Sequence, residues 1–499
     1  MSTHDRREFL KSLGGSVVTG AGAWAALESL VPARAAELAV TPEAVQFRPE
    51  MEPIVRWIEH TPREQVIEVA VNQLKRGLSY RQLHAGLFLA GIRNIKPRPV
   101  GFKFHAVMVI NSAHQLALDA PQPDRLLPFF WALDNFKASQ AQDVKEGDWV
   151  LEPVKESAVP SLEKSRRLFV EAMENWDEEA ADVAIAGLCR GAGAGEVIEM
   201  LWPYGARDWQ NIGHKIIFTA HVWRTLETIG WEHAEPVLRS LVYGLLNGGP
   251  GETAVPYAVN LSLAAKVRPD WAAGRPDPAA TNAMLKTLRQ ATPDEAAGQV
   301  VEHLNRGIAA SSIWDAVMLA AGELLMRSPG VVSLHATTAC NSLHYAFRIS
   351  GRDTTRLLTL LQGASWNVLF REAVRSRNGL PDRPLIDELE PIAASQPPTV
   401  ESIFHEMKQD RLASARQVLA LANSGQPAAP FLDAARHLVL LKGTDSHHYK
   451  FAAAAFEEFL HANRSSRPQL LAASVFYLRG ANDPDSPLLE KTRQALAVL

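Results

Sequence analysis

The sequence contains two copies of one pattern, and this internal duplication is the feature that most constrains its fold. The stretch "HAVMVINSAH" begins at His105, and "HATTACNSLH" begins at His335, 230 positions later. The match continues upstream without a gap, where "LKRG" at 74–77 corresponds to "LNRG" at 304–307. Chance identities would not stay in one frame over such a separation. A chain of repeated segments must bury its apolar faces by stacking one segment on the next.

Two weaker copies extend the pattern to four units. An Arg-Gly pair recurs at 76, 190 and 306, and a Ser-Gly pair occupies the same place at 424, so these anchors are about 115 residues apart. We expect a single repeat domain over 36–499 with units at approximately 60–175, 176–290, 291–395 and 396–499. The Arg-Gly pairs are interpreted as helix caps rather than as substrate-binding groups.

The spacing of apolar residues is helical almost throughout. Runs such as 83–92, 216–229 and 313–325 place apolar side chains at i, i+3 and i+4. Alternating, strand-like runs are scarce, and the turn signals are short, as in "NGGPG" at 247–251. The sequence therefore predicts an all-α helical repeat. Both an open α-solenoid and a closed α/α toroid fit this pattern.

Composition excludes several classes of protein. The net charge of −4 provides no basic surface for nucleic acid. Two cysteines, Cys189 and Cys340, cannot build a disulfide framework, and no C-x-x-C-H motif for covalent haem is present. After the N-terminal region, no apolar run approaches the ~18 residues needed to cross a bilayer. We therefore expect no nucleic-acid partner and no stable membrane span.

The first 35 residues resemble a twin-arginine (Tat) export signal. The segment "DRREFLK" at 5–11 follows the S/T-R-R-x-F-L-K pattern, with Asp5 where a hydroxyl residue is usual. A weakly apolar stretch follows, and "ARA" at 33–35 supplies small residues for a cleavage site. The resemblance implies the Tat translocase as a partner during export. It also implies removal of residues 1–35 and a periplasmic or secreted mature protein.

We expect one histidine to stand at the start of the second helix of each unit. These histidines are His105, His214, His335 and either His447 or His448. If the units are related by quasi-symmetry and form a ring, the four positions converge. Neutral imidazole is a common ligand of iron, copper and zinc, so we predict a transition-metal cofactor, with Fe, Cu, Zn and Mn all open. Duplicated ancestry that preserves histidine for packing is the alternative.

Three of the four units also carry a carboxylate in the preceding helix. These are Glu199, Asp315 and Asp433, which we predict to act as metal ligands or as catalytic proton acceptors. Helix geometry separates the second histidine of each pattern from this site, because His335 and His344, nine residues apart, point to opposite faces. The Asn-Ser-x-His half of the pattern is therefore predicted to form hydrogen bonds between helices.

The segment "GFKFHAVMVINSAH" at 101–114, in a long helical chain with histidine pairs opening helices, resembles the questin oxidase-like family. That resemblance implies oxidative opening of polycyclic aromatic ketones. Together with the histidines, it predicts an exported metal-dependent oxidoreductase that acts on a small molecule, with aromatic compounds among the candidates. Two other functions stay open: a non-enzymatic helical-repeat binding scaffold, and a carboxylate-based hydrolase or lyase of the α/α toroid type.

Overall fold

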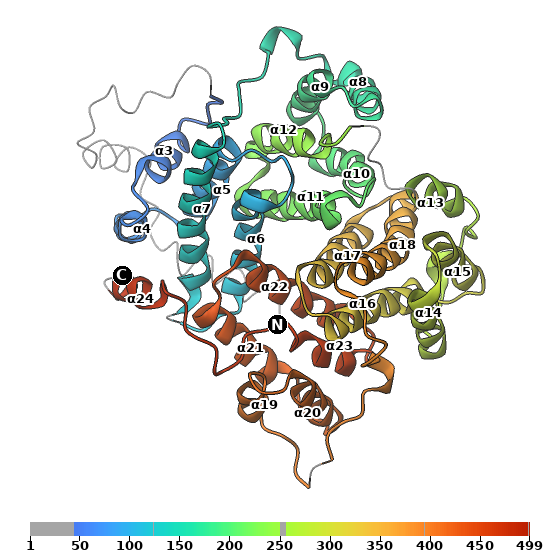
Figure 1. The fold of residues 1–499 in the computed structure, drawn as a ribbon. Coiled ribbons are helices and arrows are strands. Elements are labelled where there is room, and N and C mark those ends of the chain that lie inside the picture. Colours follow the sequence, from blue (N-terminus) through green and yellow to red (C-terminus); the bar gives the residue numbers. More distant parts are fainter. Residues whose placement is uncertain (1–43, 123, 250–255, 394, 498) are drawn as a thin grey trace. The chain divides into compact units, whose positions relative to one another are not determined.

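The fold was taken from a computed structural model that describes residues 44–122, 124–249, 256–393, 395–497 and 499 (Figure 1). The predicted export signal at 1–35 lies outside these residues. Within them the chain forms helices and short 3₁₀ turns and no β-strand, which confirms the all-α class. None of the helices in this part of the chain combines the length and the apolar character that a membrane span requires.

The chain divides into two compact units, each assembled from separate segments. The first unit comprises residues up to 197, 221–247 and 487–499, and the second comprises 198–220 and 248–486. The chain passes between the units inside two helices, α10 (Ala194–Gly205) and α11 (Gln210–Ile229). The finer division into four repeats of about 115 residues stays a prediction.

The first unit is organised around α5, which contacts α3, α6, α7 and α12. The C-terminal helix α24 packs on α4 and α7, so the end of the chain completes the unit that its beginning forms. Arg493 of α24 pairs with the buried Asp124 at 3.0 Å. The helices of this unit are α3 (Glu52–His60), α4 (Val66–Lys75), α5 (Tyr80–Asn94), α6 (His105–Leu118), α7 (Leu127–Lys145), α8 (Leu162–Asn175), α9 (Glu178–Gly191), α12 (Ala234–Leu245) and α24 (Leu489–Leu496).

The second unit is organised around α17, which is flanked by α16, α18 and α22. Sixteen of its residues, from Val332 to Phe347, form one unbroken buried run. A helix that is enclosed on all sides positions its side chains rigidly. The helices of this unit are α13 (Pro256–Ala264), α14 (Pro278–Gln290), α15 (Pro293–Asn305), α16 (Ala310–Arg327), α17 (Val331–Ile349), α18 (Asp353–Asn378), α19 (Val400–Glu406), α20 (Arg411–Asn423), α21 (Ala429–Lys442), α22 (Ser446–His461) and α23 (Arg467–Ser474).

The Arg-Gly pairs end helices, as the sequence predicted. Arg76 is the C-cap of α4 and Arg306 is the C-cap of α15. Each is followed by a glycine with positive φ, 102° at Gly77 and 81° at Gly307, and each glycine N–H donates to the carbonyl of the leucine three residues earlier. This left-handed conformation favours glycine and stops the helix. The same cap recurs at 424–425, after α20, while the pair at 190–191 forms the last two residues of α9.

Candidate metal centre

His335 is held inside the second unit by its own helix. It lies in the first turns of α17, its side chain is fully buried, and its Nδ1 is 2.6 Å from the carbonyl oxygen of Val331, one turn earlier. The hydrogen bond to this carbonyl and the close packing around α17 give the imidazole one preferred orientation. Its Nε2 is left to face away from α17.

His214 reaches the same place from α11, after an unusual turn. Asn211, Ile212 and Gly213 all have left-handed backbone angles, with φ of 52°, 53° and 77°. This conformation is costly for a β-branched residue such as Ile212. The turn brings the carbonyl of Asn211 into hydrogen-bond contact with Nδ1 of His214. Strained backbone that is kept in a structure is often found where a side chain must be aimed.

Two further contacts fix this turn. A Cβ atom at Gly213 would lie 2.7 Å from Cβ of Ala339, so only glycine lets α11 approach α17 this closely. Asp208 accepts a hydrogen bond from the backbone N–H of Gln210 and forms an ion pair of 2.7 Å with Lys215. Both charged side chains are fully buried, and a pair of this kind is costly to form unless its geometry is held.

The two imidazoles meet through their Nε2 atoms, which are 3.0 Å apart. A carbonyl oxygen can only accept a hydrogen bond, so the Nδ1 atoms of His214 and His335, which both face carbonyls, must each carry a proton. A neutral imidazole that is protonated on Nδ1 has a lone pair on Nε2. Two lone pairs therefore point at each other across this contact, and a cation between the two Nε2 atoms would stabilise it.

A proton is not favoured between the two Nε2 atoms. Burial lowers the pKa of His214 and His335 well below the usual histidine value, and the nearby charge of Lys450 lowers both further. A metal ion, in contrast, binds the neutral ring. With metal–nitrogen bonds of ~2.1 Å, adjacent ligand atoms are about 3.0 to 3.4 Å apart and opposite ones about 4.2 Å. The separation of 3.0 Å between the two Nε2 atoms matches adjacent ligands.

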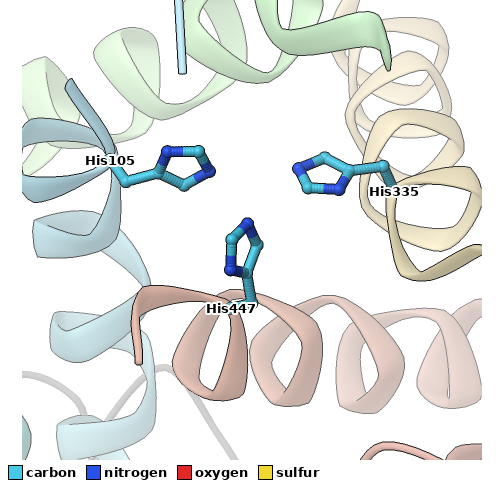
Figure 2. A group of neighbouring side chains, drawn as sticks. All are labelled: His105, His335 and His447. Atoms are coloured by element: carbon cyan, nitrogen blue, oxygen red, sulfur yellow. The ribbon is translucent and has the colours of Figure 1, made fainter. Parts of the chain in front are cut away.

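His447 is the third histidine of this cluster. It lies in the first turn of α22, and its ring centroid is 5.0 Å from that of His335. Each ring offers a ligand nitrogen, and these two nitrogens lie within 4.8 Å of each other. Figure 2 shows the two imidazoles projecting from their helices toward one another. The second unit thus places His335 between two other imidazoles, with His214 on its Nε2 and His447 beside its ring.

A carboxylate orients His447. Asp445 accepts from Nδ1 of His447 at 2.5 Å, and the same oxygen accepts from the backbone N–H of His447 at 2.8 Å, which makes Asp445 the N-cap of α22. Burial raises the pKa of Asp445, but the two hydrogen bonds and the charge of His447, together with the charge of His448, outweigh burial and lower this pKa to about 2. A carboxylate behind an imidazole fixes the tautomer and increases the basicity of the other nitrogen.

His448, the other candidate at this position, points elsewhere. Its Nδ1 accepts from the backbone N–H of Thr444 at 3.2 Å, and its ring lies 5.7 Å from that of Tyr477. Burial lowers its pKa to about 4. Of the two neighbouring histidines, His447 is therefore the one that the structure places beside His335.

His105 belongs to the first unit and has the same local arrangement. It is the first residue of α6, and its Nδ1 lies 2.8 Å from the carbonyl oxygen of Phe102. Phe102 has a left-handed φ of 48°, and the three residues before His214 are left-handed as well. All four unit-start histidines thus have Nδ1 on an acceptor that lies two to four residues earlier.

The three predicted carboxylates have other partners. Glu199 accepts from the hydroxyl of Ser350 at 2.9 Å and from the backbone N–H of Gly351 at 2.6 Å. Asp315 is buried and accepts hydrogen bonds from three groups of residues 463–466, and burial raises its pKa. Asp433 is exposed and pairs with Arg436. The contacts of Glu199 and Asp315 join helices to loops and helix ends, and that of Asp433 lies within α21 (Ala429–Lys442).

The Asn-Ser-x-His half of the pattern forms hydrogen bonds between helices, which confirms its predicted role. Asn341 donates to Glu458 at 2.8 Å, and Nδ1 of His344 lies 2.8 Å from the other oxygen of the same carboxylate, so α17 is tied to α22. In the first unit, the hydroxyl of Tyr80 in α5 bonds Nδ1 of His114 in α6 at 3.0 Å. These histidines serve packing.

Two features of the centre were not predicted from the sequence. Asp445 was not assigned to the site from the sequence, although its place two residues before His447 is a signal for an orienting carboxylate. The left-handed turn at 211–213 had no signal beyond Gly213, because Ile212 disfavours it. Comparisons of the chain with protein-family models, with curated proteins and with solved structures gave no match.

Proposed function

We propose that this protein is a metal-dependent oxidoreductase and that Nε2 of His214, His335 and His447 hold its metal ion. The observation that carries the proposal is the tautomer that the backbone imposes. His214 and His335 direct lone pairs at each other over 3.0 Å, and this contact becomes favourable when both bind one cation. A packing role does not account for two facing lone pairs in a buried place.

His105 of the first unit shares the local features of His335. It is equivalent to His335 in the predicted internal repeat, and its Nδ1 contact with the Phe102 carbonyl imposes the same tautomer. Three imidazole nitrogens form a familiar donor set for zinc, copper and iron, whereas manganese prefers oxygen donors. A redox role favours copper or iron among these. When bound, such an ion supplies a Lewis acid or a one-electron redox centre.

The protein side chains would set the properties of that ion. Asp445 holds the His447 ring in one orientation and increases the basicity of its Nε2. The left-handed turn before His214 and the enclosed helix α17 fix the other two rings, so little reorganisation accompanies metal binding. Burial excludes water from the donor atoms and strengthens their interaction with a cation.

Export and substrate class are part of the same proposal. The resemblance of residues 1–35 to a Tat signal supports loading of the metal before export of the folded protein. Replacement of Arg6 and Arg7 by lysine should retain the protein in the cytoplasm, as measured by cell fractionation.

The resemblance of 101–114 to the questin oxidase-like family places polycyclic aromatic ketones first among the substrates to test.

Metal analysis of the purified full chain tests the proposal. We expect about one transition-metal ion per chain, and we expect the metal-free protein to bind copper or iron again on titration. The double variant His214→Ala/His447→Ala should lose this ion. Metal content that is far below one per chain, or that is unchanged in the double variant, contradicts the metal site. Stoichiometric zinc without any redox turnover would keep the site and overturn the oxidoreductase assignment.

A further inference from the structure

Lys450 stands beside the imidazole cluster of the second unit. It follows His447 by three residues on α22, so the two side chains share one face of the helix. Only 2% of Lys450 is exposed. Its charge lowers the pKa of both His214 and His335.

The amine of Lys450 is unusual because it has no hydrogen-bond acceptor among the residues that the structure describes. Two other buried lysines show the ordinary arrangement. Lys215 pairs with Asp208 at 2.7 Å, and Lys137 donates to two backbone carbonyls and to the side chain of Gln140. A buried ammonium needs acceptors for three N–H groups. Lys450 therefore differs from the lysines that serve as structural cations.

The charges around Lys450 also disfavour a positively charged amine at this position. A divalent metal ion on three neutral imidazoles carries its full positive charge, and a buried ammonium nearby would add to it. Asp445 is the anion that acts on Lys450, and it already accepts the hydrogen bond of His447. The electrostatics of the proposed metal site therefore favour one more negatively charged group and disfavour a second cation.

We propose that Lys450 is carbamylated by carbon dioxide and that the resulting carbamate is the anionic ligand of the metal centre. The ligand role rests on the proposed function, whereas the modification itself rests on the buried, acceptor-free amine. Burial favours the uncharged amine, which is the form that attacks carbon dioxide.

The reaction is balanced without any redox partner. The lone pair of the Lys450 amine forms a new N–C bond to carbon dioxide, and one C=O π pair moves onto oxygen. The nitrogen loses one proton to water, which leaves a neutral N–H and a carboxylate carrying one negative charge. The side chain thus changes from a potential cation to an anion with two oxygen donors. Oxygen donors of this kind suit a site that otherwise offers only imidazole nitrogen.

Carbon-13 NMR of the full chain tests this proposal. The protein is supplied with ¹³C-bicarbonate and with the metal ion that it binds, and the spectrum is compared with those of Lys450→Met and Lys137→Met. We expect one carbamate carbon signal in the wild type and in Lys137→Met, the buried-lysine control, and none in Lys450→Met. A signal that persists in Lys450→Met, or a wild type without any signal, overturns the proposal.

Metal affinity supplies the second measurement. Lys450→Met should bind the metal at least about 100-fold more weakly than the wild type, whereas Lys450→Glu, which carries a permanent carboxylate, should recover part of the loss and no longer respond to bicarbonate. Equal affinity in Lys450→Met and wild type overturns the ligand role. A wild type that binds metal without a carbamate signal refutes the carbamate alone, and a carbamate signal without metal binding refutes the proposed metal centre alone.

Discussion

Helix α17 carries two histidines with different surroundings. His335 near its start has Nδ1 on a backbone carbonyl and Nε2 3.0 Å from Nε2 of His214. His344, nine residues later, has Nδ1 on the Glu458 carboxylate at 2.8 Å, and Trp314 stacks on its ring with centroids 4.5 Å apart. Both histidines are buried in the same unit, and both belong to the repeated pattern.

The difference shows that burial and repetition do not make a histidine a ligand. His344 has a partner of opposite polarity and an aromatic ring over its face, so its hydrogen-bonding and packing needs are met. His335 faces a second imidazole through Nε2, and a cation between the two rings would stabilise this contact. The face of α17 that carries His335 is therefore the one that we propose as the metal-binding face, and the face that carries His344 joins α17 to α22.

The largest expected effect separates these two faces directly. Replacement of His335 by alanine removes one metal–nitrogen bond, so we expect the metal affinity to fall by about 100- to 1000-fold. Replacement of His344 by alanine should leave the affinity unchanged and instead lower the free energy of unfolding by about 1–3 kcal/mol, because Glu458 loses a buried partner. Calorimetric titration and urea denaturation measure the two quantities. Equal metal affinities in the two variants would falsify the distinction.

The next effect tests how the imidazoles are oriented. Asp445→Asn keeps an N-cap for α22, since asparagine caps a helix as well as aspartate does. The replacement weakens the hydrogen bond that Nδ1 of His447 donates to residue 445. We expect the metal affinity to fall by about 10- to 100-fold with little change in helix content. Asp410→Asn, at the exposed N-cap of α20, is the matched control and should change neither. If both variants bind metal equally, Asp445 acts only as a cap.

The smallest effect concerns the supporting face and its counterpart in the first unit. His114 corresponds to His344 in the repeat, and the ring of His84 covers it with centroids 4.8 Å apart. His84 is fully buried, and burial, together with the charge of His114, lowers its pKa well below the usual value. The folded state thus keeps His84 neutral, whereas an unfolded histidine binds a proton below about pH 6.5. The contribution of neutral His84 to the free energy of unfolding is therefore fully present above about pH 6.5 and decreases below it.

His84→Phe should remove this pH dependence. Between pH 6 and pH 5, the free energy of unfolding of the metal-free wild type should fall by up to about 1.4 kcal/mol more than that of the variant. Urea denaturation at both pH values measures the difference. The same replacement at the exposed His405 serves as control and should leave the wild-type dependence in place. Parallel declines in wild type and His84→Phe would contradict the assignment.

Much of this arrangement could be predicted from the sequence because it depends on periodicity. Helical spacing indicates the all-α class, and the angle of 100° per residue is enough to place His335 and His344 on different faces of one helix. The Arg-Gly pairs mark helix ends because positive φ favours glycine. The repeated frame singles out His105 and His335 among 16 histidines.

The sequence could not predict the partners of side chains that meet across helices. Equivalent positions in a repeat indicate which helix a carboxylate occupies but not what faces it. Glu199 and Asp315, which were assigned to the site, accept hydrogen bonds from groups at helix ends, and Asp433 pairs with Arg436 of its own helix. The turn before His214 runs against local preference at Ile212, and tertiary packing imposes it. The lack of a hydrogen-bond acceptor for the Lys450 amine among the described residues likewise depends on the helices around it and has no signal in the sequence.

The return of α24 to the first unit has a consequence for how the protein is made. Residues 487–499 are synthesised more than 300 residues after α4 and α7, yet the helix that they contain, α24, packs on both. Lys491 and Arg493 then bond Glu64 and Asp124. The packing of the first unit is therefore complete only after residues 487–499 have been synthesised, whereas most domains fold as they emerge. A chain that stops before residue 487 lacks the helix that covers α4 and α7.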